Sequence, residues 1–305
     1  MRLNTPSGEL GKNHVWFRPL WLAAAMLLGA MNLWAAPIKT AIIQGQSNAS
    51  HNMVAQGNEM KKILESTELF AVDIITTPAK GQDMSGFKPK FADYQLVVMN
   101  YDGDPWPTET QADFVKYMTN GGAMVVVHSA DNAFGRWKEF NEMIAVGGWG
   151  GRNANSGPCL RFRDGKWVPL EVPGPGGSHG RPRPYVVTTR EPTHPIMQGL
   201  PKAWLHVSDE CYDRLRGPAK NVTVLASATA DAQSGGSGEE EPVLMAITYG
   251  QGRIFHTTMG HGAKEIKCVG FTVTLQRGAE WAATGKVTQK VPADLPTETE
   301  TKSRP

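Results

Sequence analysis

Short apolar runs alternate with amphipathic segments over the first half of the chain. The runs predict four β-strands, at residues 38–43, 70–75, 96–99 and 123–127. Apolar residues recur at helical spacing over residues 52–66, and Thr108-x-x-Gln111 is a capping-box pattern that begins a second helix ending near Met118. Strands and helices that alternate at these intervals predict a parallel sheet with helices on both faces.

The second half is less regular. Residues 147–184 are rich in glycine, proline, arginine and serine, and a stretch of this kind inside a domain is usually a functional loop or disordered. Further strands are predicted at residues 185–187, 222–225, 243–248 and 253–257, followed by a closing helix over 271–283. The Thr-, Glu- and Pro-rich residues 287–305 predict a disordered C-terminal tail.

The first 35 residues have the composition of a secretory signal peptide. Basic Arg2, Lys12 and Arg18 precede an apolar run over residues 20–33, and small residues follow it. This run is shorter than the roughly 20 residues that a membrane-spanning helix needs. We therefore expect residues 1–35 to direct export to the periplasm or medium, and we expect no membrane association after cleavage.

Charge and cysteine content exclude several classes of protein. The chain carries a formal charge of +2, and residues 1–35 contribute three cations and one anion, so the rest is close to neutral. A neutral domain has no electrostatic basis for binding nucleic acid. The three cysteines, Cys159, Cys211 and Cys268, have no CxxC spacing, which argues against a zinc ribbon or a thioredoxin-type site. Their pairing and the oligomeric state are left unassigned.

Polar residues gather where the predicted strands end. Ligands of open parallel sheets bind beyond the carboxyl ends of the strands, so these residues are candidates for one pocket. For each residue alone, a side chain that caps its own loop is the simpler explanation, but several at one edge favour a binding site. The candidates are Gln46, Asn48, His51, Asp102, His128, Ser129, Asp131 and His261.

Four segments resemble the motifs of the ThuA-like (trehalose-utilisation) family. In the family's order, they are Ile43–His51, Gly121–Phe134, Asp209–Tyr212 and Tyr249–His261. The resemblance implies a flavodoxin-like, class I glutamine amidotransferase-like α/β fold, with a doubly wound, mostly parallel sheet. It covers essentially all of the single domain that we assign to residues 36–286.

The chain departs from true glutamine amidotransferases at one position. Those enzymes carry a nucleophilic cysteine at the turn after the central strand, where this chain has His128. No cysteine precedes Cys159, so glutamine hydrolysis through a Cys–His pair is excluded at this position. Gly262 also stands where family members usually have aspartate after the last histidine, which removes any role of that aspartate.

Five residues form the leading candidate catalytic group. Imidazole suits acid–base catalysis because its pKa lies near neutral pH, and a carboxylate can orient it or accept a proton. The group consists of His51, His128, His179, Glu210 and His261. A divalent metal is an alternative, with His128, His179, Glu210 and His261 as ligands, although no HxH or HExxH spacing supports it.

Other residues are weaker candidates for ligand contact. Trp106 follows a strand end and is a candidate for lining the pocket, and Tyr212 lies in the Asp-Glu-x-Tyr motif. His194 matches another pattern of the family and is a candidate for ligand contact. An equal alternative is that it has a structural role in a turn. His206 and His256 lie within apolar patterns and are expected in the core or the pocket wall.

Two functional interpretations stay open. The first is an exported enzyme acting on a disaccharide or keto-glycoside, as the family's association with trehalose implies. The second is a carbohydrate-binding or other small-ligand domain that has lost the amidotransferase nucleophile. A purely structural module is disfavoured, because several ionisable groups in one cleft are costly without a task.

The signal-peptide assignment makes a direct prediction. Cleavage after Ala35 should leave a chain that begins at Ala36, because small residues follow the apolar run. Mass spectrometry of protein recovered from the periplasm or medium would measure this directly. Recovery of exported protein with Met1 still attached would contradict the assignment.

Overall fold

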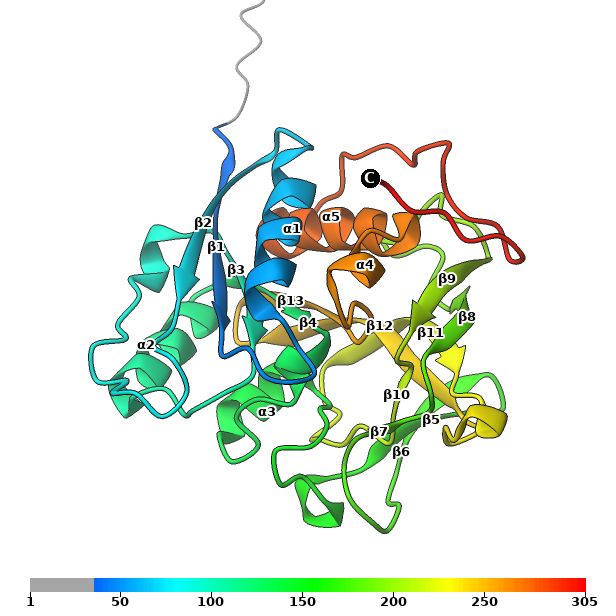
Figure 1. The fold of residues 1–305 in the computed structure, drawn as a ribbon, viewed down its shortest axis with the longest axis horizontal. Helices are drawn as coiled ribbons and strands as arrows, with labels where there is room; N and C mark the ends of the chain where they lie inside the picture. Colours follow the sequence, from blue (N-terminus) through cyan, green and yellow to red (C-terminus); the bar gives the residue numbers. More distant parts are fainter. Residues whose placement is uncertain (1–35) are drawn as a thin grey trace, which may run out of the picture. The chain divides into compact units, whose positions relative to one another are not determined.

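A computed structural model describes residues 36–305, and the predicted signal peptide lies outside this range. The domain is built on one sheet of nine strands, in the order β2-β1-β3-β4-β13-β12-β11-β8-β9 (Figure 1). The strands are β1 (Ile38–Gly45), β2 (Phe70–Thr76), β3 (Leu96–Tyr101), β4 (Ala123–Val127), β8 (Arg183–Thr189), β9 (Ala203–Asp209), β11 (Val222–Thr229), β12 (Glu240–Tyr249) and β13 (Gly252–Thr257).

The sheet has a parallel part and an antiparallel part. β2, β1, β3, β4 and β13 are parallel, and their registers bring the strand ends to one edge, where Gln44 lies opposite Asn100 and Val127 opposite Thr257. From β13 to β9 every pairing is antiparallel. The doubly wound α/β sheet predicted from the sequence is confirmed.

Helices cover both faces of the sheet. The helices are α1 (Met53–Glu65), α2 (Thr108–Thr119), α3 (Lys138–Ile144), α4 (Ala263–Ile266) and α5 (Val269–Thr284). Strand β4 is buried throughout, and its side chains alternate between two cores. Val125 packs in the core that includes α1 and α5, whereas Val126 packs in the core that includes α2 and α3. Among residues 36–305, no helix is both long enough and apolar enough to cross a membrane.

The segment from 147 to 184 contains more structure than the sequence predicted. A hairpin forms from β5 (Cys159–Arg163) and β6 (Lys166–Leu170), and β7 (Ser178–His179) pairs with β10 (Tyr212–Asp213). The hairpin turn is Asp164-Gly165, and both residues have positive φ. Asp-Gly is a strong hairpin turn signal, so this element was recognisable from sequence.

The C-terminal residues 287–305 differ from the expected disordered tail. They run beside α5 (Figure 1), and the amide of Val269 donates to Lys302 O at 2.9 Å. The amide of Leu205 donates to Thr297 O at 2.7 Å, and Arg277 donates to Gln289 O at 2.6 Å. Hydrogen bonds to the rest of the domain hold this segment in place. A prediction of disorder from polar composition does not take such long-range bonds into account.

Close packing between α5 and the sheet leads to a stability prediction. A Cβ placed on Gly278 would lie 2.2 Å from Cδ1 of Phe255, a fully buried side chain of β13. We therefore expect Gly278→Ala to lower the free energy of unfolding by about 1–3 kcal/mol, although alanine favours helix. Chemical denaturation would measure the difference.

The matched control is Gly86→Ala. No atom lies within 4 Å of a Cβ built on this exposed glycine, so the free energy of unfolding should change by no more than about 0.5 kcal/mol. If Gly278→Ala were as stable as the wild-type chain, the proposed packing of α5 on β13 would be wrong.

Candidate functional site

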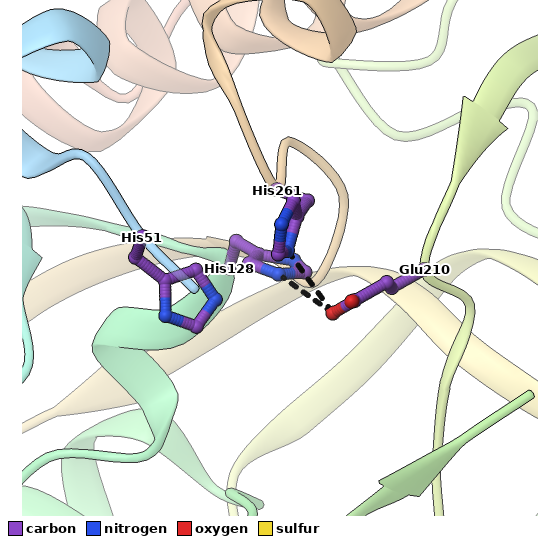
Figure 2. A group of neighbouring side chains, drawn as sticks. All are labelled: His51, His128, Glu210 and His261. Carbon is purple, nitrogen blue, oxygen red and sulfur yellow. Dashed lines mark ion pairs between the residues drawn. The ribbon is translucent and has the colours of Figure 1, made fainter. Parts of the chain in front are cut away.

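Five side chains converge beyond the carboxyl ends of the parallel strands, and we call this group the histidine pocket. Its members are His51, His128, His179, Glu210 and His261, all of them predicted from the sequence. Figure 2 shows His51, His128 and His261 together with Glu210, which approaches from the end of β9. One ligand atom from each of these four residues lies within 4.8 Å of the others.

His128 is the most buried member of the pocket. It begins a 3-10 turn directly after β4 and has a left-handed backbone with φ +46°. Such a conformation costs a non-glycine residue on the order of 1–3 kcal/mol and is held by the surrounding fold. Its Nδ1 lies 2.7 Å from Thr258 O. Because a carbonyl only accepts hydrogen bonds, Nδ1 donates to it, and Nε2 faces Glu210.

A short turn positions His51 just ahead of α1. The side-chain oxygen of Asn48 accepts the amides of Ser50 and His51, both at 2.9 Å. Asn48 also donates its own amide to His51 O at 3.0 Å. The His51 ring lies 4.8 Å from that of His261 and 5.4 Å from that of His128, measured between centroids. Asn48, predicted to contact a ligand, instead holds the backbone that places His51.

Glu210 is the common partner of three imidazoles. Its Oε2 lies 3.1 Å from His261 Nδ1 and 3.6 Å from Nε2 of both His128 and His179. His179 comes from β7, which pairs with β10 so that His179 lies opposite Tyr212. The Tyr212 ring covers His128 at a centroid distance of 4.1 Å. Tyr212 therefore forms a wall of the pocket.

The electrostatics of the pocket favour an ionised carboxylate. Burial opposes ionisation of Glu210, but His128 and His261 outweigh it and hold the pKa of the carboxyl well below its usual value. Glu210 in turn raises the pKa of His261. Burial, together with the neighbouring His128 and His261, lowers the pKa of His51 to about 4. At neutral pH the pocket thus contains an anionic Glu210 and an uncharged His51.

Asp209 anchors the loops that carry two of these residues. Its Oδ1 accepts the amides of Glu210 at 2.8 Å and His261 at 3.3 Å. Its Oδ2 accepts the amide of Gly260 at 2.7 Å and contacts His206 Nε2 at 2.9 Å. Burial works against protonation of His206, but hydrogen bonding to Asp209 raises its pKa to about 9. Asp209 and His206 were not predicted as site residues, although the position of Asp209 beside Glu210 was visible in the motif.

Three other predicted ligand contacts are engaged within the protein. Gln46 donates to Pro78 O at 2.9 Å and to Asp104 Oδ2 at 3.2 Å. Ser129 is buried with its hydroxyl 3.9 Å from the sulfur of Met53. Asp131 is fully buried, with Oδ2 3.3 Å from His256 Nε2. Each of these side chains supports the strand-end loops.

Asp102 faces open space at the same sheet edge. It lines a pocket of ≈ 420 Å³ together with Asn132 and Trp137. Burial and the nearby Asp131 carboxylate raise its pKa to about 6. This residue remains available to a ligand.

Trp106 differs from its predicted role, and His194 has the structural role that was one of its two predicted alternatives. Trp106 is 2% exposed and packs among aromatic rings that include Phe87, at 5.3 Å between centroids, so it belongs to the core and does not line the pocket. Its position before α2 was compatible with either role. His194 packs against Trp281 of α5 at 5.0 Å, and its Nδ1 accepts the Ile196 amide at 3.3 Å, which supports the structural alternative.

The donor set of the histidine pocket suits a transition metal better than magnesium or calcium, which prefer oxygen ligands. His51, His128, His261 and Glu210 supply three imidazoles and one carboxylate within mutual reach. The set expected from sequence contained His179 in place of His51. His179 reaches Glu210 but lies outside this group of four.

Comparison with known proteins identifies several similar chains. The family model ThuA, described as trehalose utilisation, matches residues 39–282. A ThuA-like protein from Parabacteroides merdae shares 52% sequence identity at a TM-score of 0.85, over 88% of this chain and 98% of its own. One from Bacteroides uniformis shares the fold, with 19% identity and a TM-score of 0.56 over 85% and 96% of the two chains. No curated protein sequence is significantly similar.

The buried contacts of Asp209 lead to a stability prediction. Asp209→Asn keeps the shape of the side chain but removes the charge that faces His206 and three backbone amides. Breaking a buried pair in this way costs about 3–5 kcal/mol, so we expect a loss of that size in the free energy of unfolding. Equilibrium denaturation would measure it.

Asp294→Asn is the control, because Asp294 pairs with Arg304 at the surface. An exposed pair contributes about 0–1 kcal/mol, so this variant should be nearly as stable as the wild-type chain. Equal losses in both variants would contradict the anchoring role of Asp209.

Proposed function

Since this chain belongs to the ThuA (trehalose-utilisation) family, we propose that it is an enzyme that acts on a disaccharide or keto-glycoside in the histidine pocket. One observation carries the proposal: His128, His179 and His261 each place a ring nitrogen 3.1–3.6 Å from Glu210 Oε2. Structural ion pairs rarely need three imidazoles around one carboxylate. Acid–base catalysis does use such groups, because they exchange protons near neutral pH.

The chemistry fits a sugar that carries a carbonyl group. A C–H bond beside a ketone is acidified, and the imidazole of His179, which Glu210 orients, can accept its proton. The imidazole of His261 can then donate a proton to the developing oxyanion or to a leaving hydroxyl. Proton removal of this kind begins both isomerisation and elimination, so the reaction class follows from which bond the substrate breaks next.

Part of the histidine pocket is accessible to solvent, which contact with a substrate requires. The side chains of His179 and His261 are 33% and 27% exposed, whereas that of His128 is fully buried. The exposed members are therefore those that a ligand meets first. His128 lies behind them, against the Tyr212 ring.

Cysteine chemistry is not part of the proposal. His128 stands where glutamine amidotransferases carry the nucleophile, and Cys159 and Cys268 are buried elsewhere in the domain. The predicted signal peptide further assigns this carbohydrate chemistry to the periplasm or the medium.

The proposal predicts a selective effect of His128→Asn. Asparagine retains a donor near the position of Nδ1, which can still bond to Thr258 O, but it removes Nε2 from the pocket. We expect kcat/KM for the best substrate in a panel of disaccharides and their 3-keto forms to fall by about 10²- to 10⁴-fold. Sugar release or isomer formation, followed by chromatography, is the measurement.

His194→Asn is the matched control, because His194 contacts Trp281 and none of the pocket residues. Its kcat/KM should equal that of the wild-type chain, and circular dichroism should show both variants folded. Binding without turnover by the wild-type chain would favour the ligand-binding alternative. Full activity of His128→Asn would contradict the proposal.

A further inference from the structure

Unsatisfied ring nitrogens concentrate in the histidine pocket. Among the described residues, both nitrogens of His51 and Nε2 of His128 are buried without a hydrogen-bond partner, and Nδ1 of His261 has only its ion-pair contact with Glu210. A buried polar atom without a partner destabilises the fold. A ligand that accepts nitrogen lone pairs would satisfy one nitrogen of each of these three rings.

The spacing of the donor atoms matches a single metal ion. One donor atom each from His51, His128, His261 and Glu210 lies within 4.8 Å of the others. Tetrahedral Zn²⁺ with bonds of roughly 2.0–2.1 Å places its ligands about 3.3 Å apart. Glu210 Oε2 is already 3.1 Å from His261 Nδ1 and 3.6 Å from His128 Nε2. Small side-chain movements would complete the coordination.

The surroundings hold these donors in place. A metal-binding histidine typically donates its second ring N–H to a carbonyl, and His128 does so to Thr258 O at 2.7 Å. Asp209 accepts the backbone amides of both Glu210 and His261. The Asn48 turn fixes the backbone of His51. Every donor therefore has a supporting contact, and none of these contacts occupies a nitrogen that faces the pocket.

We propose that His51, His128, His261 and Glu210 bind one divalent transition-metal ion, with Zn²⁺ or Co²⁺ as the fitting ions. His179 stays outside the coordination sphere and orients the Glu210 carboxylate from its more exposed side. In the proposed function such an ion would polarise a sugar carbonyl in place of the proton from His261, and His179 would still accept the proton from carbon. That role rests on the proposed function, whereas metal binding is measured without any sugar.

The test is Co²⁺ binding by the full chain after treatment with a chelator. Tetrahedral Co²⁺ gives intense visible absorption, and elemental analysis gives the stoichiometry, which we expect to be one ion per chain. His51→Gln should weaken binding by at least the roughly 10- to 100-fold that loss of a mere supporting contact costs. His179→Gln, which removes only a supporting contact, should weaken Co²⁺ binding less than His51→Gln does and leave the spectrum unchanged.

His261→Gln provides a second ligand variant at a less buried position, and thermal unfolding shows which variants fold. An absence of Co²⁺ absorption in the wild-type chain overturns the proposal, as does wild-type binding by the folded His51→Gln and His261→Gln variants. Loss of binding in His179→Gln with retention in His51→Gln would also overturn it. Sugar turnover that persists in the metal-free chain would overturn the catalytic role of the ion and leave the proposed function intact. A metal-loaded chain that neither binds nor converts any sugar would overturn the proposed function and leave the metal site intact.

Discussion

The common register of the parallel strands is the constraint on which the site depends. Hydrogen bonding between β1, β3, β4 and β13 requires their carboxyl ends to reach one edge of the sheet. Each chain segment that leaves this edge starts next to the others, however far apart the segments lie in sequence. His51, His128 and His261 become neighbours for this reason, and the buried apolar strands beneath them provide the rigid support that a precise arrangement needs.

The antiparallel part of the sheet contributes the carboxylate of Glu210 to the site. Glu210 follows β9, the strand farthest from β2, and Asp209 connects it to the loop after β13. Adjacent residues at this strand end point in opposite directions, so Asp209 turns toward His206 and Gly260 while Glu210 turns into the pocket. One short segment thus supplies both the functional carboxylate and the buried carboxylate that holds its surroundings.

The sequence predicted those parts of the molecule that local pattern controls. Apolar periodicity located the parallel strands, and the sheet-edge rule then selected His51, His128 and His261. Glu210 was added only by similarity to a family motif, and His179 only as the histidine of the irregular segment 147–184, since their strands have no fixed relation to the parallel part. Long-range packing was not predictable. Trp106 before α2 could have faced solvent or core, and whether His51 or His179 joins the other imidazoles depends on angles that no spacing encodes. The Asp209–His206 pair was missed because buried ion pairs have no sequence signature.

Helix α5 has polar as well as apolar residues buried along its length, and residues 287–305, which run beside it, account for part of this. Arg277 and Gln276 bond to backbone or side-chain atoms of Gln289, and the Val269 amide bonds to Lys302 O. These partners follow α5 in the sequence, so they are synthesised after it. Until they have left the ribosome, α5 lacks these contacts, and the packing of this helix is completed only after the helix itself has been made.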